Sequence, residues 1–200
     1  MQLPPGNIFH YPSALKSERR LPKELPLRAK RQNVAPTSFI LCASIREQRM
    51  DLFSADLPLR PTWNSYLFTR RYLVSTSRFG IGETENSNYT PRGLHKIGRK
   101  VGGGWPVGTA FKSRQPIGST WQGMPNAPIA HRIMWLEGLE PGFNRGEGVD
   151  TFKRYVYIHG LGNEPSLGRP DSHGCIHLSS SDIMPLYDRL PEGTLVWIQP

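Results

Sequence analysis

Helical periodicity is confined to one short stretch near the C-terminus of this chain. Four apolar residues there follow the i, i+3, i+4, i+7 spacing of a single helix face: Ile183, Leu186, Tyr187 and Leu190. Asp182 is the predicted N-cap, which places Pro185 at N3, where a missing amide hydrogen costs no helical hydrogen bond. Pro191 and Gly193 are expected to end the helix. The rest of the chain must therefore fold with little helix.

Short runs rich in β-branched and aromatic residues fill most of the remaining sequence. The predicted strands are 38–45, 49–53, 66–68, 71–75, 92–97, 107–111, 131–136, 152–158 and 194–199. A length of 200 residues with 37% hydrophobic content is enough for one substantial core. We expect a mainly β domain with one short C-terminal helix packed on it and long loops.

Two segments interrupt this pattern. Residues 1–37 carry six prolines and show no helix or strand period, so they are predicted to be an irregular, partly extended lead-in to a domain at 38–200. Residues 98–150 form a loop-rich insertion whose glycines surround the one short strand at 107–111. The triple glycine at 102–104 lacks a following Gly-Lys-Ser/Thr, so a phosphate-binding loop is not predicted.

The charge balance favours an anionic partner. The net charge is +9, and residues 1–31 supply +5 of it through seven basic and two acidic residues. No recognised nucleic-acid motif accompanies these charges, so nucleic acid is not the expected partner. No run approaches the ~18 apolar residues of a membrane span. The first twenty residues lack the apolar core of a secretory signal.

The chemistry of the chain centres on one of its two cysteines. Cys42 lies in the apolar run 39–43, where a buried and inert thiol is expected. Cys175 instead follows Ser172-His173-Gly174, and His159 stands 16 residues upstream at the end of the predicted strand. Because a thiol attacks as the thiolate, a neighbouring base is needed, and the strand ending at His159 could run beside Cys175. Gly174 could free nearby amides to face a developing oxyanion.

Two other interpretations of this stretch stay open from the residues alone. His173, Cys175 and His177 alternate, so on a strand they would share a face and could bind zinc or copper, with His159 as a fourth ligand. Structural zinc sites usually show wider-spaced ligand pairs, so no metal site is predicted. Cys175 could also be a core thiol, although the glycine and polar residues before it argue against that.

Taken together, these motifs resemble the L,D-transpeptidase catalytic domain, or YkuD domain, of bacterial cell-wall enzymes. Its hallmark is His-Gly, a gap of somewhat over a dozen residues, and Ser-His-Gly-Cys followed by an apolar residue, found here at 159–160 and 172–176. The Thr-Pro-Arg-Gly turn at 90–93 and the closing helix and strand extend the likeness over residues 38–200. The resemblance implies a mixed β-sheet with a sandwich-like or barrel-like arrangement.

The resemblance also implies a reaction, an acyl transfer on peptidoglycan. Cys175 would attack the carbonyl at the L-centre of the third stem residue and release the terminal D-alanine, with His159 as general base and acid. The acyl group would then pass from the thioester to an amine of a second stem peptide or of a protein to be anchored in the wall. Backbone amides of Gly174 and Cys175 would hold the oxyanion, and His173 would orient the substrate or assist them. No cofactor is implied.

Four further residues are expected at the substrate: Ser172, which also shapes the loop, Gly160, Arg92 and His177. His177 departs from the family pattern, which usually has arginine there, a permanently charged group that grips carboxylates with two hydrogen bonds. The implied substrate places the protein in the periplasm or cell envelope. Hydrolysis of the same thioester, an L,D-carboxypeptidase activity, is the alternative reaction. A non-enzymatic wall-binding module is the alternative function.

Overall fold

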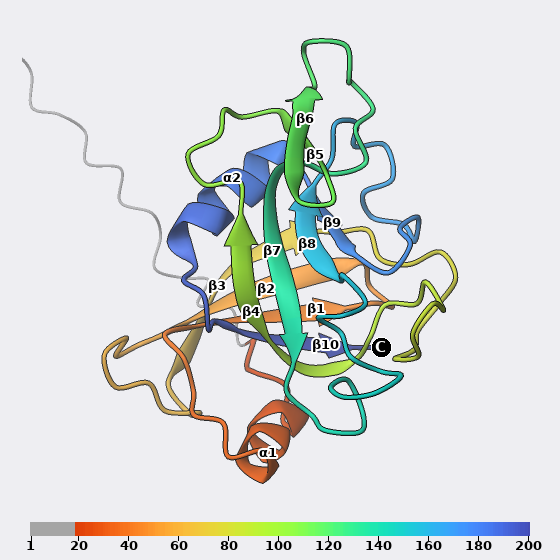
Figure 1. Cartoon of the computed structure of the whole chain (residues 1–200). Coiled ribbons are helices and arrows are strands. Elements are labelled where there is room, and N and C mark those ends of the chain that lie inside the picture. Colours follow the sequence, from red (N-terminus) through yellow and green to blue (C-terminus); the bar gives the residue numbers. More distant parts are fainter. Residues whose placement is uncertain (1–18) are drawn as a thin grey trace, which may run out of the picture.

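The core of the molecule is a mixed sheet, seen here in a computed structural model that describes residues 19–200. It has ten strands, and the long neighbouring strands β4 and β7 lie near its centre (Figure 1). In spatial order the main path is β3 (Tyr66–Leu73), β2 (Arg49–Ala55), β1 (Phe39–Ser44), β10 (Leu195–Gln199), β4 (Gly93–Val101), β7 (Ala130–Gly138), β5 (Thr109–Lys112) and β6 (Gln115–Ser119). Off this path, β8 (Tyr157–Gly160) pairs with β7, and β9 (Ile176–Leu178) pairs with β8.

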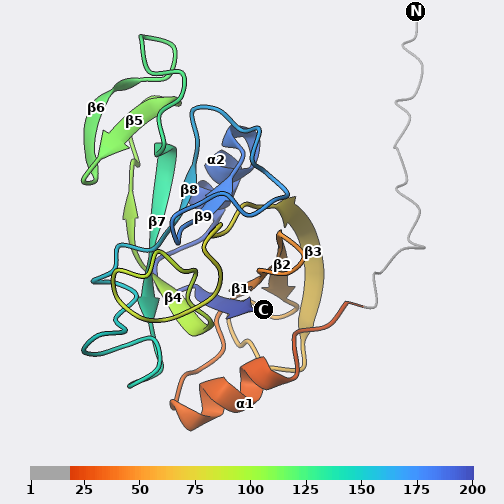
Figure 2. The ribbon, with the colours of Figure 1, turned by 90° about the vertical axis from the view of Figure 1, so that its right-hand side faces the viewer.

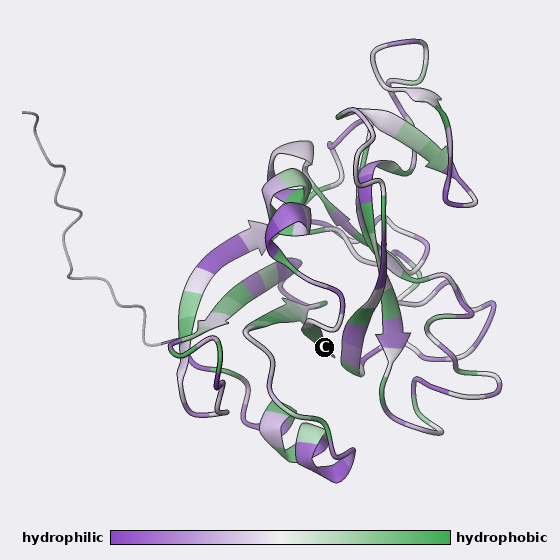
Figure 3. Cartoon of the chain, turned by 60° about the vertical axis from the view of Figure 1, so that its left-hand side comes forward, coloured by the Kyte–Doolittle hydropathy of each residue, from purple (hydrophilic) through white to green (hydrophobic). Residues whose placement is uncertain are grey.

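Each face of the sheet is covered by one helix. Along β1, Leu41 and Ala43 join the apolar cluster that contains α2 (Ser180–Arg189), whereas Ile40 and Cys42 join the cluster that contains α1 (Glu24–Arg31). A strand buried on both faces needs a continuous apolar run, and β1 has one. Figure 2 shows α1 below the sheet and the β5–β6 hairpin projecting at the opposite end. Both helices carry apolar and polar segments, as expected of amphipathic helices (Figure 3).

The mainly β fold, the mixed sheet and the C-terminal helix were predicted from the sequence and are confirmed. The part of the lead-in from residue 19 onward contradicts the prediction, since residues 24–31 form α1 instead of irregular chain. Leu25 and Ala29, four residues apart, are fully buried against the sheet, and the basic residues of the last turn suit the negative end of the helix dipole. The lead-in over residues 1–18 lies outside the described residues.

Four elements also differ from the predictions. The runs 66–68 and 71–75 form the single strand β3, and the glycine-rich region contains a second strand, β6, paired with β5. The strand expected over 152–158 begins only at Tyr157, because residues 151–155 make a turn in which Tyr155 has φ +57°. Helix α2 begins earlier than predicted, with Ser179 as its N-cap, so Pro185 lies inside the helix. Neither helix within residues 19–200 is long and apolar enough to cross a membrane.

Candidate active site

Two short parallel strands bring the predicted nucleophile and base together. In the register of β8 and β9, Ile158 lies beside Ile176 and His159 beside His177, so Cys175 comes directly before the paired segment. The rings of His159 and His177 are 4.7 Å apart between centroids. His159 and Cys175 line the same cavity of about 470 Å³. The sixteen-residue separation in sequence is thus closed by strand pairing.

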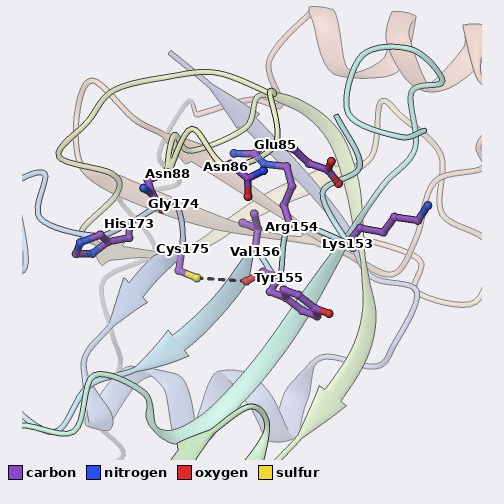
Figure 4. Close-up of a pocket in the computed structure, with 10 residues that line it drawn as sticks. All are labelled: Glu85, Asn86, Asn88, Lys153, Arg154, Tyr155, Val156, His173, Gly174 and Cys175. Carbon is purple, nitrogen blue, oxygen red and sulfur yellow. Dashed lines mark hydrogen bonds between the residues drawn. The ribbon is translucent and has the colours of Figure 1, made fainter. Parts of the chain in front are cut away.

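The thiol of Cys175 is held by two backbone groups. Its Sγ accepts a hydrogen bond from the amide of Tyr157 at 3.4 Å and donates one to the carbonyl of Tyr155 at 3.6 Å (Figure 4). Burial raises the pKa of the thiol to about 11, an effect that the Tyr157 amide and the positive charge of Arg154 oppose. Cys175 is therefore a protonated thiol at neutral pH and needs a base before it can attack.

His159 has the tautomer and the charge state that such a base requires. Its Nδ1 lies 2.9 Å from the carbonyl of Gly160, which can only accept, so Nδ1 carries the hydrogen and Nε2 keeps its lone pair. The side chain is buried, and this burial lowers its pKa to about 4. The imidazole is consequently neutral at physiological pH, with one nitrogen able to accept a proton.

The nucleophile can be reached from two sides. Beside the cavity shared with His159, a second cavity of about 310 Å³ is lined by Glu85, Asn88, Arg154 and Tyr155 among others (Figure 4). Cys175 and His173 line both cavities. Both cavities therefore border the residue that carries the predicted nucleophile.

The loop before Cys175 is fixed by its own hydrogen bonds. The hydroxyl of Ser172 donates to the carbonyl of Cys175 at 2.6 Å and accepts from the amide of Gly174 at 3.1 Å. Ser172 is 1% exposed, so it shapes the loop. The contact with a substrate that was expected for Ser172 is not possible in this arrangement. Gly174 has φ +117°, and a Cβ atom there would lie 3.1 Å from the carbonyl oxygen of Tyr89.

These bonds correct the expected oxyanion donors. The amide of Gly174 is already engaged by Ser172, so it is not available to a developing oxyanion in this arrangement. The amide of Cys175, by contrast, has no hydrogen-bond partner among residues 19–200. It is the better-placed donor of the pair.

The remaining predicted substrate residues differ in position. His177 lines the cavity, but burial and the neighbouring His159 and His173 lower its pKa to about 3, so it is neutral. Its buried Nδ1 has no hydrogen-bond partner in the described part of the chain. Gly160 is buried, and a Cβ there would lie 2.8 Å from the carbonyl of Ala130, so its role is close packing.

Arg92 is not at the site. Its guanidinium binds Glu83 at 2.8 and 3.1 Å, and the residue lines neither cavity at Cys175. The sequence placed it in the Thr-Pro-Arg-Gly turn, but the nearby acidic residue that neutralises it was not recognised. The expected contact with a substrate carboxylate is therefore wrong for this arrangement.

Two arginines at the site were missed by the sequence interpretation. Arg154 lines the smaller cavity and donates to the carbonyls of Gly82, Glu83 and Tyr89. Arg78 lines the larger cavity and donates to Nε2 of His173 at 2.9 Å. The only signal was a basic residue in or near a recognised segment, since residue 154 lies within the expected strand 152–158 and residue 78 follows the run 71–75.

The described residues contain no group of three or more His, Cys, Asp or Glu that could hold a metal ion. This goes against the alternative in which the alternating residues at 173, 175 and 177 bind zinc or copper. Cys42 is free and buried, and burial raises its pKa above the usual range of a thiol. The inert role predicted for Cys42 agrees with this environment.

Comparison with known proteins places the site in context. The profile of the YkuD family, the L,D-transpeptidase catalytic domain, matches residues 38–198. A Bacillus licheniformis protein named as an L,D-transpeptidase, YkuD, is 40% identical over 48 residues, which are 24% of this chain and 29% of that protein. The match thus spans under a third of this relative's length.

Similar solved structures have low sequence identity to this chain. The structure of Bdellovibrio bacteriovorus Bd1075 is 13% identical, with a TM-score of 0.50, and the match covers 82% of this chain and 48% of that one. L,D-transpeptidase 3 from Mycobacterium tuberculosis is 17% identical with a TM-score of 0.48, covering 82% and 61% respectively. The chain therefore spans about half to three fifths of the length of these solved proteins.

Proposed function

The chain belongs to the L,D-transpeptidase catalytic domain family, and from this premise we propose that it is a peptidoglycan L,D-transpeptidase. The observation that carries the proposal is the pairing of Cys175 with His159 in one cavity, with the histidine neutral and its Nε2 free to accept a proton. The substrate would be a stem tetrapeptide, and the leaving group its terminal D-alanine.

The proposed reaction proceeds through a thioester. The thiol rotates away from the Tyr155 carbonyl, His159 Nε2 takes its proton, and Sγ attacks the carbonyl carbon of the third stem residue. The amide of Cys175 donates to the resulting oxyanion. His159 then returns the proton to the departing D-alanine amine as the carbon–nitrogen bond breaks. The thioester remains on Cys175.

The second half of the reaction needs an amine acceptor. The amine attacks the thioester, His159 removes its proton, and the thiol of Cys175 is restored when the new amide forms. The two cavities that meet at Cys175 support transfer over hydrolysis, because an acceptor can enter from one side while the acyl chain occupies the other. The acceptor is a second stem peptide or a protein to be anchored in the wall.

The experiment is incubation with disaccharide-tetrapeptide, followed by mass spectrometry. We expect free D-alanine and a cross-linked dimer, both abolished in Cys175→Ala. Cys42→Ala is the matched control, since it removes the other thiol, which is buried away from the site, and should retain both products. Dimer formation by Cys175→Ala would disprove the proposal. D-alanine and tripeptide without dimer would instead assign the L,D-carboxypeptidase reaction.

The proposed substrate implies where the protein acts. Peptidoglycan lies outside the cytoplasm, so we place the protein in the periplasm or cell envelope, where its net charge of +9 suits an anionic polymer.

A non-enzymatic wall-binding module would not react with a carbapenem. Rapid stoichiometric acylation of Cys175 by a carbapenem is expected and would rule that alternative out.

A further inference from the structure

The larger cavity at Cys175 has few charged groups for a site that must bind an anionic peptide. Two of its lining residues carry a formal charge, the cation Arg78 and the anion Asp171. The histidines at 159 and 177 are neutral, as described above. His173 accepts a hydrogen bond at Nε2 from Arg78.

Arg78 is fixed to the loop that carries the nucleophile. Its segment runs beside that loop through two bridges, Ser75 with His177 and Ser77 with Ser172. The backbone amide of Arg78 itself donates to the carbonyl of Ser172 at 3.1 Å. The position of Arg78 relative to Cys175 is therefore set by backbone hydrogen bonds and not by side-chain packing alone.

The guanidinium of Arg78 has unused hydrogen-bonding capacity. It packs over the ring of Phe79, 4.9 Å from the centroid, and donates a single hydrogen bond, to His173. A guanidinium has five N–H donors in a planar fork that matches a carboxylate. Other arginines of the chain already pair with carboxylates: Arg28, Arg70, Arg71 and Arg92. Within residues 19–200, no carboxylate lies within ion-pair distance of Arg78.

We propose that Arg78 binds the C-terminal carboxylate of the acyl-donor peptide, and so makes the enzyme specific for donors that end in a free carboxylate. The inference rests on the proposed function. The geometry favours Arg78 over His177, whose ring is neutral and whose Nδ1 is buried without a partner in the described residues. It also favours Arg78 over Arg92, which Glu83 neutralises away from the site.

The test compares two donor peptides and three enzyme variants. The donors are disaccharide-tetrapeptides that end in D-alanine or in D-alaninamide, and the readout is kcat/KM for release of the terminal residue. The variants are Arg78→Ala, Arg78→Lys and Arg169→Ala. Arg169 is exposed and lines neither cavity, so its removal controls for the loss of one positive charge near the site.

The wild type is expected to prefer the free acid by about 10- to 100-fold, as charged hydrogen bonds usually provide. Arg78→Ala should lose this preference, because release from the acid slows far more than release from the carboxamide. Arg78→Lys should retain part of the preference as a point charge, and Arg169→Ala should retain all of it. Release from the carboxamide by Arg78→Ala also shows that the variant is folded.

Three results would overturn the role of Arg78 without contradicting the proposed function. The wild type could release both terminal residues equally well, or Arg78→Ala could keep the preference for the acid. Arg78→Ala could also lose activity equally on both donors, which would indicate a structural role. Release of neither terminal residue by the wild type would instead contradict the proposed function, and the inference with it.

Discussion

Arg154 is a cation held by neutral groups. Its guanidinium donates to three backbone carbonyls and to the hydroxyl of Ser87, while Glu83 and Glu85 act on it only at longer range. No direct carboxylate partner within residues 19–200 neutralises it. Its charge therefore acts on Cys175, where it offsets part of the rise in the thiol pKa that burial causes.

Replacing this charge should make the nucleophile less acidic. In Arg154→Gln we expect a higher pKa for Cys175 and slower alkylation by iodoacetamide at pH 8, because the thiolate fraction falls tenfold for each unit of pKa. Lys153→Gln is the matched control, since it removes an exposed charge from the same cavity. Equal alkylation rates in the wild type and Arg154→Gln would contradict this role of Arg154.

At the residue scale, the sequence pointed to the proposed nucleophile and base but not to their electrostatic surroundings. Cys175 and His159 were predictable because their glycine neighbours and the strand before His159 are local patterns. Arg78 and Arg154 were not, because their roles depend on which carbonyl oxygens and carboxylates lie near them in space. Arg92 was assigned to the substrate for the same reason, since its partner Glu83 becomes apparent only in the fold.

Helix α2 closes the larger apolar cluster, and its N-terminus is capped by Ser179. The Ser179 side chain accepts a hydrogen bond from the amide of Asp182 at 3.1 Å. The interior Pro185 lacks the amide hydrogen that would extend the helical bonding, so the first turn depends on this cap.

Removing the cap should destabilise the protein measurably. We expect Ser179→Ala to lower the free energy of unfolding by about 1 kcal/mol in urea titrations. Ser180→Ala, one position later, removes the same hydroxyl from a residue that provides no cap and should change stability by less than about 0.5 kcal/mol. A Ser179→Ala variant as stable as the wild type would show that the cap is not needed.

The elements that the sequence missed have long-range causes. Helix α1 is short and contains Pro26 in its first turn, and its burial against Leu94 and Trp197 outweighs its weak local pattern. The turn at 151–155 places Tyr155 at positive φ, which its aromatic side chain gives no reason to expect. Strands β1, β2, β7 and β10 were predictable because burial imposes a continuous or alternating apolar pattern on them.

Several histidine side chains are neutral in the folded protein. Burial lowers the pKa of His95 and His159 to about 4 and that of His177 to about 3, each below the ordinary value of 6.5. Between the lowered pKa of each histidine and its ordinary value of 6.5, the unfolded chain therefore binds more protons than the folded chain. The stability that this difference contributes is complete above pH 6.5 and is lost as the pH falls toward 4.

We accordingly expect the urea midpoint to fall steadily between pH 7 and pH 4.5. Each fully buried histidine contributes on the order of a few kcal/mol over the full range. A midpoint that is constant over this range would contradict the neutral burial of these side chains.

The protonated state of Cys175 has a consequence for its chemical survival. With a pKa of about 11, about one molecule in 10⁴ carries the thiolate at pH 7, and peroxides oxidise the thiolate much faster than the thiol. The hydrogen bond to the Tyr155 carbonyl keeps the proton on sulfur until substrate and His159 draw it away. We therefore expect Cys175 to resist oxidation to sulfenic acid in the resting protein, and to become vulnerable to oxidants only during the proposed reaction.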